Sequence, residues 1–166
     1  MVVEAEAYLT ENDEACHTFM RPSTRSFVER NQPGTAYVYL NYGVHWMLNV
    51  LVKGGPRDGL ILIRALEPRE GIRIMQRRRG VSELRQLCSG PGKLAQALDI
   101  TIRHHEMDLC RDPRQCFVEA AEIGANAVVT DPRIGISRAV DLPWRFTLRD
   151  SPFVSVPVKK NKARRR

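Results

Sequence analysis

Residues 37–50 read YVYLNYGVHWMLNV, and the interpretation of the chain starts from this stretch. Apolar side chains recur at every second position on both sides of a central turn, which is the period of β-strands. The turn falls at Asn41-Tyr42-Gly43, where the glycine can supply the positive φ that a tight turn requires. The pattern therefore predicts a β-hairpin.

The tip of this hairpin carries a large aromatic side chain. Hairpin tips are highly exposed and usually hold small polar residues. Tyr42 occupies the tip instead, and Tyr37 and Tyr39 lie on one face of the strand that leads to it. A rigid, exposed aromatic tip favours contact with a flat partner.

Length and composition indicate a single domain. The chain has 166 residues, of which 43% are hydrophobic, enough to build one core. It has no run of 18 apolar residues, and its first residues do not form an export signal, so we expect neither a membrane span nor secretion. The cysteines Cys16, Cys88, Cys110 and Cys116 form no Cys-x-x-Cys pair, which is typical of a reduced cytosolic protein.

The net charge of +7 is unevenly distributed. Six basic residues fall in the last eight positions, which leaves +1 for the rest of the chain. Residues 4–14 are acidic, and arginines gather between residues 69 and 85. This polarity suits a polyanion that is held on both sides of a carboxylate. For the tail alone, an ordinary solvated charge run is an equally good explanation.

Periodicity and turn residues predict an α+β fold: one domain with a mixed, mostly antiparallel curved sheet, helices packed on one side and a protruding β-hairpin. Residues 10–32 are expected to form a long loop with a helical turn near residues 13–17. Besides the hairpin, strands are expected at residues 2–9, 60–66, 116–119, 127–130, 144–148 and 153–156, and helices at 67–79, 82–87 and 94–98.

Two pairs of residues are candidates for a buried polar site. Glu6 and Tyr8 lie two positions apart on a strand, so both side chains point to the same face. The alternative is a solvated sheet face, although the small neighbours Ala5 and Ala7 leave room for a ligand. Arg64 and Asn49 each interrupt an apolar strand and are costly to bury without a partner. Arg64 could face Glu6 or reach solvent.

The Gly-rich stretch SGPGK at residues 89–93 is a candidate for phosphate contact. It lacks the spacing of a nucleotide-binding loop, but its free backbone N–H groups at Gly92, beside Lys93, suit one phosphate of a nucleic-acid backbone. A purely structural turn is an equally good interpretation. The histidines His17, His104 and His105 and the cysteines lack zinc-like spacing, so no metal is expected.

Six segments in order along the chain together resemble the alkyladenine (3-methyladenine) DNA glycosylases of the mammalian type. They are VEAEAYL (3–9), DEACH (13–17), PGTAYVY (33–39) with Tyr42-Gly43, IRALEP (63–68), LCSGPGKL (87–94) and SPFVSV (151–156). The resemblance implies a glycosylase-like domain over residues 1–157, followed by a basic disordered tail over 158–166. It implies a monomeric, monofunctional enzyme without a cofactor, which acts on duplex DNA that contains a damaged purine.

The resemblance also assigns roles. Glu6 matches the general base and Arg64 the residue that helps to hold the water. Tyr8, His17, Tyr39 and Asn49 match the base pocket, where Asn49 excludes guanine. Tyr42 matches the side chain that fills the gap in the duplex, and Lys93, Gly92 and Arg25 are assigned to the DNA backbone. Cytoplasmic (nucleoid-associated) placement follows for a bacterial source and nuclear placement for a eukaryotic one.

Chemistry supports these roles independently. A base must leave the stack before it is excised, and an aromatic tip can fill the space it leaves. An alkylated purine is cationic and is therefore attracted to electron-rich rings, by about 0.5–2 kcal/mol for each contact. One ionised carboxylate can both activate water and stabilise an oxocarbenium-like sugar.

The chain departs from the family pattern in two places. Family members carry a helix and a strand before the strand that bears the glutamate, so here we expect an exposed sheet edge. Their Arg-Asn and Met-Phe pairs correspond to Arg25-Ser26 and Glu29-Arg30. A non-catalytic DNA-binding protein is the alternative function, and a formyltransferase-like small-molecule site rests on fold analogy alone.

Overall fold

The structure is a computed structural model that describes residues 1–113, 117, 124 and 126–158. The strand predicted at residues 116–119 and the tail predicted at 158–166 fall almost entirely outside these residues. No described helix is both long and apolar enough to cross a lipid bilayer.

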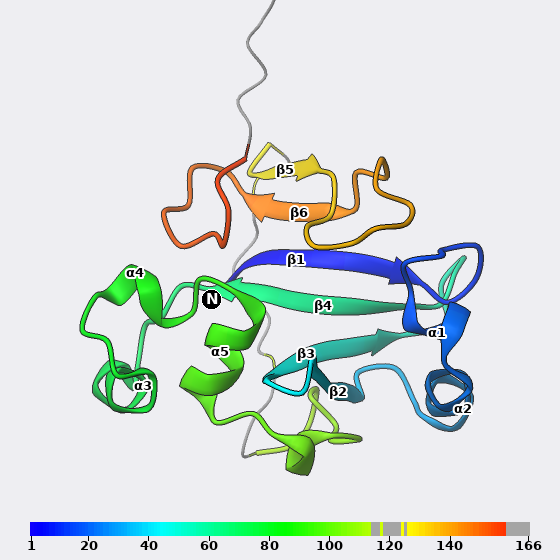
Figure 1. Cartoon of the computed structure of the whole chain (residues 1–166), viewed down its shortest axis with the longest axis horizontal. Helices are drawn as coiled ribbons and strands as arrows, with labels where there is room; N and C mark the ends of the chain where they lie inside the picture. The colour runs from blue at the N-terminus through cyan, green and yellow to red at the C-terminus, as the bar shows by residue number, and fades with distance from the viewer. Residues whose placement is uncertain (114–116, 118–123, 125, 159–166) are drawn as a thin grey trace, which may run out of the picture.

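The described strands form one six-stranded sheet in which every pair of neighbours is antiparallel (Figure 1). Its strands, in spatial order, are β2 (Ala36–Asn41), β3 (His45–Val52), β4 (Gly59–Leu66), β1 (Val2–Leu9), β6 (Arg145–Leu148) and β5 (Val128–Asp131). The predicted hairpin is β2 and β3, and the predicted α+β class is confirmed. The apolar strand at 60–66 is β4, which lies inside the sheet as expected.

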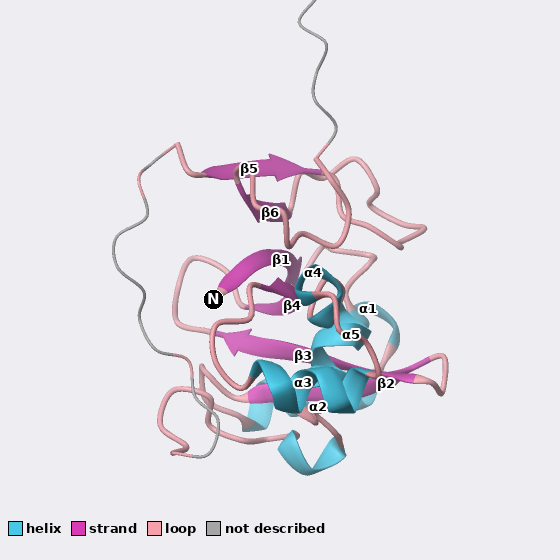
Figure 2. Ribbon diagram, turned by 90° about the vertical axis from the view of Figure 1, so that its left-hand side faces the viewer, coloured by secondary structure: helices cyan, strands magenta, loops and turns pink. Residues whose placement is uncertain are grey.

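One face of the sheet carries the main apolar core. Val38, Leu48 and Ile63 project from three strands onto this face and pack with Leu94. The helices that cover it are α3 (Ile72–Arg79), α4 (Leu84–Leu87) and α5 (Pro91–Leu98), with the 3₁₀-helix η1 (Ile102–His104) after them. Figure 2 shows the helices over the β1–β4 part of the sheet, with β5 and β6 above them.

The opposite face carries a second, smaller core and the polar residues. Tyr37, Leu51 and Leu60 alternate with residues of the main core and pack against Phe27. Phe27 lies in α2 (Pro22–Arg30), which follows α1 (His17–Met20) at the other end of the sheet from α3 (Figure 1). The long loop predicted for residues 10–32 is therefore wrong. The helix was missed because its sequence, PSTRSFVER, holds only two large apolar side chains, Phe27 and Val28, too few to show a period.

Some observed elements differ from the predicted ones, and the helix predicted at 82–87 begins at Leu84. Residues 67–70 do not open a helix, because Gly71 adopts φ of 66° and α3 begins only at Ile72. The helix predicted from residue 94 begins at Pro91, whose missing N–H is not needed in a first turn. The strand predicted at 153–156 is absent, since these residues form turns and bends beside β1.

The edges of the sheet also differ from expectation. β1 pairs with β4 on one side and with β6 on the other, so it is not an exposed edge. Among the described strands the edges are β2 and β5. The free side of β2 is partly covered, because the Ala36 N–H donates to the carbonyl oxygen of Met107 and the Val38 N–H donates to Nδ1 of His105.

Candidate active site and nucleic-acid interface

A cavity of about 720 Å³ lies on the polar face of the sheet. It is bounded by β-strand side chains, by α1, by the hairpin tip and by the loop over residues 134–138. Its lining includes six residues that the sequence singled out: Tyr8, His17, Tyr39, Tyr42, Asn49 and Arg64. The fold thus brings residues from four separate stretches of the chain to one place.

Glu6 is not itself among the residues that line this cavity: it lies beneath them, and its side chain is fully buried. Its Oε2 accepts hydrogen bonds from the Tyr8 hydroxyl at 2.8 Å and from Arg64 at 3.2 Å. Its Oε1 accepts one hydrogen bond, at 2.7 Å, from the backbone N–H of Ile134. All three donors line the cavity. The alternative of a solvated sheet face for Glu6 is therefore wrong, and Oε1 keeps the capacity to accept a further proton donor.

Arg64 points inward and binds two carboxylates. Besides Glu6 it contacts Glu4, whose Oε1 lies 2.8 Å from its Nε. Glu4 also accepts hydrogen bonds from Arg145 and from Ser155. Burial raises the pKa of Glu4, but the hydrogen bonds from Arg145, Ser155 and Arg64 outweigh burial and hold this pKa below its usual value.

Aromatic rings form one wall of the cavity. The rings of His17 and Tyr39 lie 4.4 Å apart between centroids at 63°, and Nδ1 of His17 lies 3.0 Å from the Tyr37 hydroxyl. Burial, with the nearby charge of Arg21, lowers the pKa of His17 to about 4. Burial raises the pKa of Tyr39 to about 12. The rings of His17 and Tyr39 are therefore uncharged near pH 7, and the positive charges that line the cavity come from arginines such as Arg21 and Arg64.

Asn49 is buried in β3 and faces the same cavity. Its Nδ2 donates a hydrogen bond of 3.1 Å to the carbonyl oxygen of Tyr37, on the neighbouring strand. This bond fixes the amide plane and supplies the partner that a buried amide requires.

The hairpin tip projects away from the protein. Tyr42 is 89% exposed and adopts φ of 49°, and its neighbours Leu40 and Val44 are also exposed. Tyr42 is also among the residues that line the cavity. The tip therefore presents three exposed hydrophobic side chains, those of Leu40, Tyr42 and Val44, next to one another.

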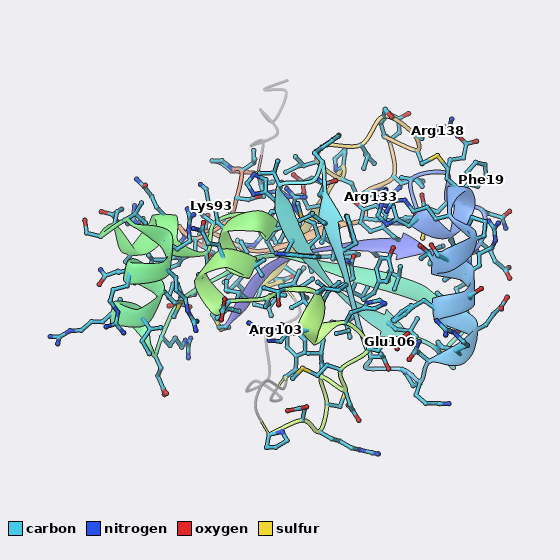
Figure 3. The ribbon with its side chains drawn as sticks, turned by 60° about the horizontal axis from the view of Figure 1, so that its bottom comes forward. Phe19, Lys93, Arg103, Glu106, Arg133 and Arg138 are labelled. Atoms are coloured by element: carbon cyan, nitrogen blue, oxygen red, sulfur yellow. The ribbon has the colours of Figure 1, made fainter. Side chains whose placement is uncertain are left out.

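The residues assigned to the DNA backbone lie outside the cavity lining. Lys93 projects from α5 with an exposed side chain (Figure 3). A Cβ atom at Gly92 would lie 3.0 Å from Cβ of His45, so this glycine also allows α5 to approach the hairpin. Arg25 donates to the carbonyl oxygens of Thr18 and Phe19 at 2.6 and 3.4 Å, and so supports the end of α1.

Sequence reasoning missed the loop that closes the cavity. Arg133 forms a buried ion pair with Asp13, with N···O distances of 2.6 and 2.9 Å. Its guanidinium lies 4.5 Å from the centroid of the Tyr8 ring. The residue after Arg133, Ile134, donates its N–H to Glu6. Figure 3 labels Arg133. No local signal identifies a pair whose members are 120 residues apart.

The histidines and cysteines do not assemble into a metal site within the described part of the chain. Nδ1 of His105 accepts the Val38 N–H at 3.1 Å, and Nδ1 of His104 accepts the N–H of Thr101 at the same distance. Both rings therefore have structural partners.

Comparisons with known proteins agree with this geometry. The family model described as "Methylpurine-DNA glycosylase (MPG)" matches residues 1–152. A protein of Rhodopseudomonas palustris (strain BisB18) is 48% identical over 95% of this chain and 76% of its own length. A protein of Nitrosospira multiformis is 44% identical over 96% and 80%, and one of Chlorobaculum parvum is 44% identical over 98% and 80%. Each bears the name "Putative 3-methyladenine DNA glycosylase". The extent of these matches shows that the chain belongs to the methylpurine-DNA glycosylase family, a family of DNA-repair enzymes that act on DNA.

Proposed function

We propose that this DNA glycosylase acts as a monomer, flips alkylated purines such as 3-methyladenine out of duplex DNA and hydrolyses the N-glycosidic bond with a water activated by Glu6. The observation that carries the proposal is one buried carboxylate, with acceptor capacity left on Oε1, beneath a cavity walled by aromatic rings. The name of the relatives supports this choice of damaged base.

The cavity suits a flat, cationic base. Tyr8, His17 and Tyr39 present rings to its interior, and each ring that meets the face of the base adds a cation–π contact. His17 is neutral because its pKa is lowered to about 4, so the pocket contains no competing cation on that ring. Asn49 is held rigidly by its bond to Tyr37 and is proposed to crowd the exocyclic amino group of guanine.

The chemical step needs one proton acceptor. A water beside Oε1 of Glu6 adds through its oxygen to C1′ of the sugar and gives a proton to the carboxylate. The C1′–N bond breaks with its electron pair going to the base, whose positive charge is thereby cancelled. Arg64 orients Glu6 through Oε2, and the negative charge of Glu6 stabilises the oxocarbenium-like sugar.

The remaining residues serve the duplex. Tyr42, at the exposed tip, is proposed to fill the gap left by the flipped nucleotide. Lys93 and the backbone N–H of Gly92, in the first turn of α5, are proposed to contact one phosphate. Arg25 is proposed as a second backbone contact, made with the guanidinium nitrogens that do not hold α1.

The decisive test is release of free base from DNA treated with a methylating agent. We expect the parent protein to release 3-methyladenine and Glu6→Gln to do so at least 100-fold more slowly, because the proton acceptor is lost. Glu11→Gln, which neutralises an exposed acid nearby, is the matched control and should retain the parental rate. Base release by Glu6→Gln at the parental rate would contradict the proposal.

A further inference from the structure

A second buried carboxylate, Glu4, lies behind Glu6 and has no part in the step described above. Its side chain is fully buried and accepts four hydrogen bonds. Three of them end on Oε1: from Nε of Arg64 at 2.8 Å, from Nε of Arg145 at 2.9 Å and from the Ser155 hydroxyl at 2.7 Å. The Ser155 N–H donates to Oε2 at 2.5 Å. Glu4 is thus the centre of a polar network that is concentrated on its Oε1 atom.

This network attaches the end of the described chain to the floor of the cavity. Ser155 is 151 residues from Glu4 in sequence and lies in the segment 151–158, which has no helix or strand. Arg145, in β6, donates to Glu4 and Asp131 and also to the carbonyl oxygen of Val156. The segment is therefore held by the same charged groups that surround Arg64.

The network determines how Arg64 meets Glu6. A free guanidinium normally pairs with a carboxylate through two parallel N–H···O bonds. Here Nε of Arg64 donates to Glu4, and the second terminal nitrogen lies 3.4 Å from the Ser155 hydroxyl. Only the first terminal nitrogen is left for Glu6, and it reaches Oε2 alone. As a result, Oε1 of Glu6 accepts a single N–H within the described structure, that of Ile134.

We propose that Glu4, held by Ser155 and Arg145, is a positioning residue of the active centre: it divides Arg64 between two carboxylates and so leaves Oε1 of Glu6 able to accept a hydrogen bond from the water. The inference rests on the proposed function of Glu6. A role in stability alone is a poor explanation, because buried ion networks stabilise a fold little compared with apolar packing of the same volume. The hydrogen bonds from Arg145, Ser155 and Arg64 keep the pKa of Glu4 below its usual value despite burial, so Glu4 carries the charge that holds Arg64.

Ser155→Ala tests the inference without removing a buried charge. It deletes the hydroxyl that bonds Glu4 and approaches Arg64, and leaves the backbone N–H in place. We expect single-turnover release of 3-methyladenine to slow about tenfold, the order of loss caused by misplacing a catalytic group. The dissociation constant for a duplex with an abasic analogue should change less than about twofold, because neither Ser155 nor Glu4 lines the cavity.

Two variants control for a merely structural effect. Ser155→Thr keeps a hydroxyl and should restore most of the rate. Ser151→Ala removes another hydroxyl from the same segment, one that accepts the N–H of Phe153 and forms no hydrogen bond with Glu4 or Arg64 among the described residues, and it should keep the parental rate. Glu4→Gln removes the charge and should slow release at least as much as Ser155→Ala, at temperatures where circular dichroism shows it folded.

The outcomes separate the two proposals. If the parent releases base and Ser155→Ala releases it equally fast, the positioning role of Glu4 is wrong and the function of Glu6 stands. Equal loss in Ser155→Ala and Ser151→Ala, or equal loss of duplex binding and rate, would also overturn the inference. If the parent releases no base at all, the proposed function fails and the inference fails with it.

Discussion

At the scale of single residues, Tyr42 combines an unfavourable backbone with an exposed side chain. A non-glycine residue at φ of 49° costs roughly 1–2 kcal/mol relative to glycine, and the ring, which is 89% exposed, recovers little of this by packing. We expect Tyr42→Gly to leave the melting temperature unchanged or to raise it. The same variant should bind a duplex with an abasic analogue about tenfold more weakly and undamaged duplex equally well, because only the gap needs the ring.

Thermal unfolding and titration of the two duplexes measure both effects. The undamaged duplex is the internal control, because phosphate contacts are common to both. A fall in the melting temperature with unchanged binding to the abasic duplex would mean that the ring stabilises the hairpin and does not fill the gap.

His17 gives a prediction on pH. Its pKa is lowered to about 4 in the folded protein by burial and by Arg21, whereas it is about 6.5 when unfolded. Above pH 6.5 both states hold the neutral ring. Between pH 6.5 and 4 the unfolded state binds a proton that the folded state does not, so the free energy of unfolding falls as the pH falls through this window.

Urea unfolding of the parent and of His17→Gln at pH 7 and pH 4.5 measures this contribution. Between pH 7 and pH 4.5 the free energy of unfolding of the parent should fall by about 1–2 kcal/mol more than that of the variant. This is less than the full change in the pKa of His17 would give, because the ring is partly exposed and its charge is screened by solvent. An equal loss in the two proteins would show that His17 titrates normally in the folded state.

At the residue scale, the sequence singled out side chains that the structure gathers in one place, and it did so where a polar residue interrupts an apolar pattern. Glu6, Arg64 and Asn49 each interrupt an apolar strand, and the structure brings all three to one cavity or its floor. Glu4 interrupts the same strand as Glu6, but its partners Arg145 and Ser155 are distant in sequence and contact it only in the folded chain. The sequence therefore held no sign of the network around Glu4.

At the scale of elements, the loop over residues 132–138 depends on one ion pair. Asp13 and Arg133 are both fully buried at their side chains, and Asp13 also accepts the N–H groups of Leu9 and Ala15. Asp13→Asn would leave the guanidinium without a compensating charge, so we expect a loss of about 3–5 kcal/mol in the free energy of unfolding. Base release should fall as well, because Ile134 no longer holds Glu6.

A matched control is the exposed pair of Arg30 and Glu106, whose N···O distance is 3.5 Å. Glu106→Gln should change the free energy of unfolding by less than about 0.5 kcal/mol. Urea titration monitored by circular dichroism compares the two variants. Equal, small effects would mean that Asp13 does not hold the loop.

The sequence predicted elements that keep one period over their whole length. β1, the hairpin and β4 were found because side chains alternate between two faces. It could not predict α2, which is anchored by Phe27 and Val28 through tertiary packing. It also assigned a strand to residues 153–156, where Ser155 donates its N–H to a carboxylate instead of to a neighbouring strand.

At the scale of the whole molecule, the two faces of the sheet carry different kinds of side chain. One face is sealed by α3–α5 over an apolar core, and the other holds the carboxylates, the rings and the cavity. The hairpin continues from this second face to the exposed tip, and α5 begins beside it, where Gly92 approaches His45. The tip that carries Tyr42 and the proposed phosphate contact at Gly92 and Lys93 are therefore positioned by the same packing.

This arrangement predicts which charges set the salt dependence of DNA binding. Each phosphate neutralised by the protein releases counterions and adds about 0.9 to the slope of the logarithm of affinity against the logarithm of salt concentration. Lys93→Ala should reduce that slope by about one and weaken binding to damaged and undamaged duplex alike, with an unchanged melting temperature, because its side chain is exposed. Arg25→Ala should reduce the slope similarly and also lower the melting temperature, because the carbonyl oxygens of Thr18 and Phe19 lose their donor.

Arg57→Ala is the control for both variants. Arg57 is exposed in the turn between β3 and β4, at the end of β3 opposite the hairpin tip, so it should not meet the same duplex. Fluorescence anisotropy with a labelled duplex at four salt concentrations measures the slopes. If Arg57→Ala lowers the slope as much as Lys93→Ala does, the DNA does not lie across the hairpin and α5, and the proposed orientation of the duplex is wrong.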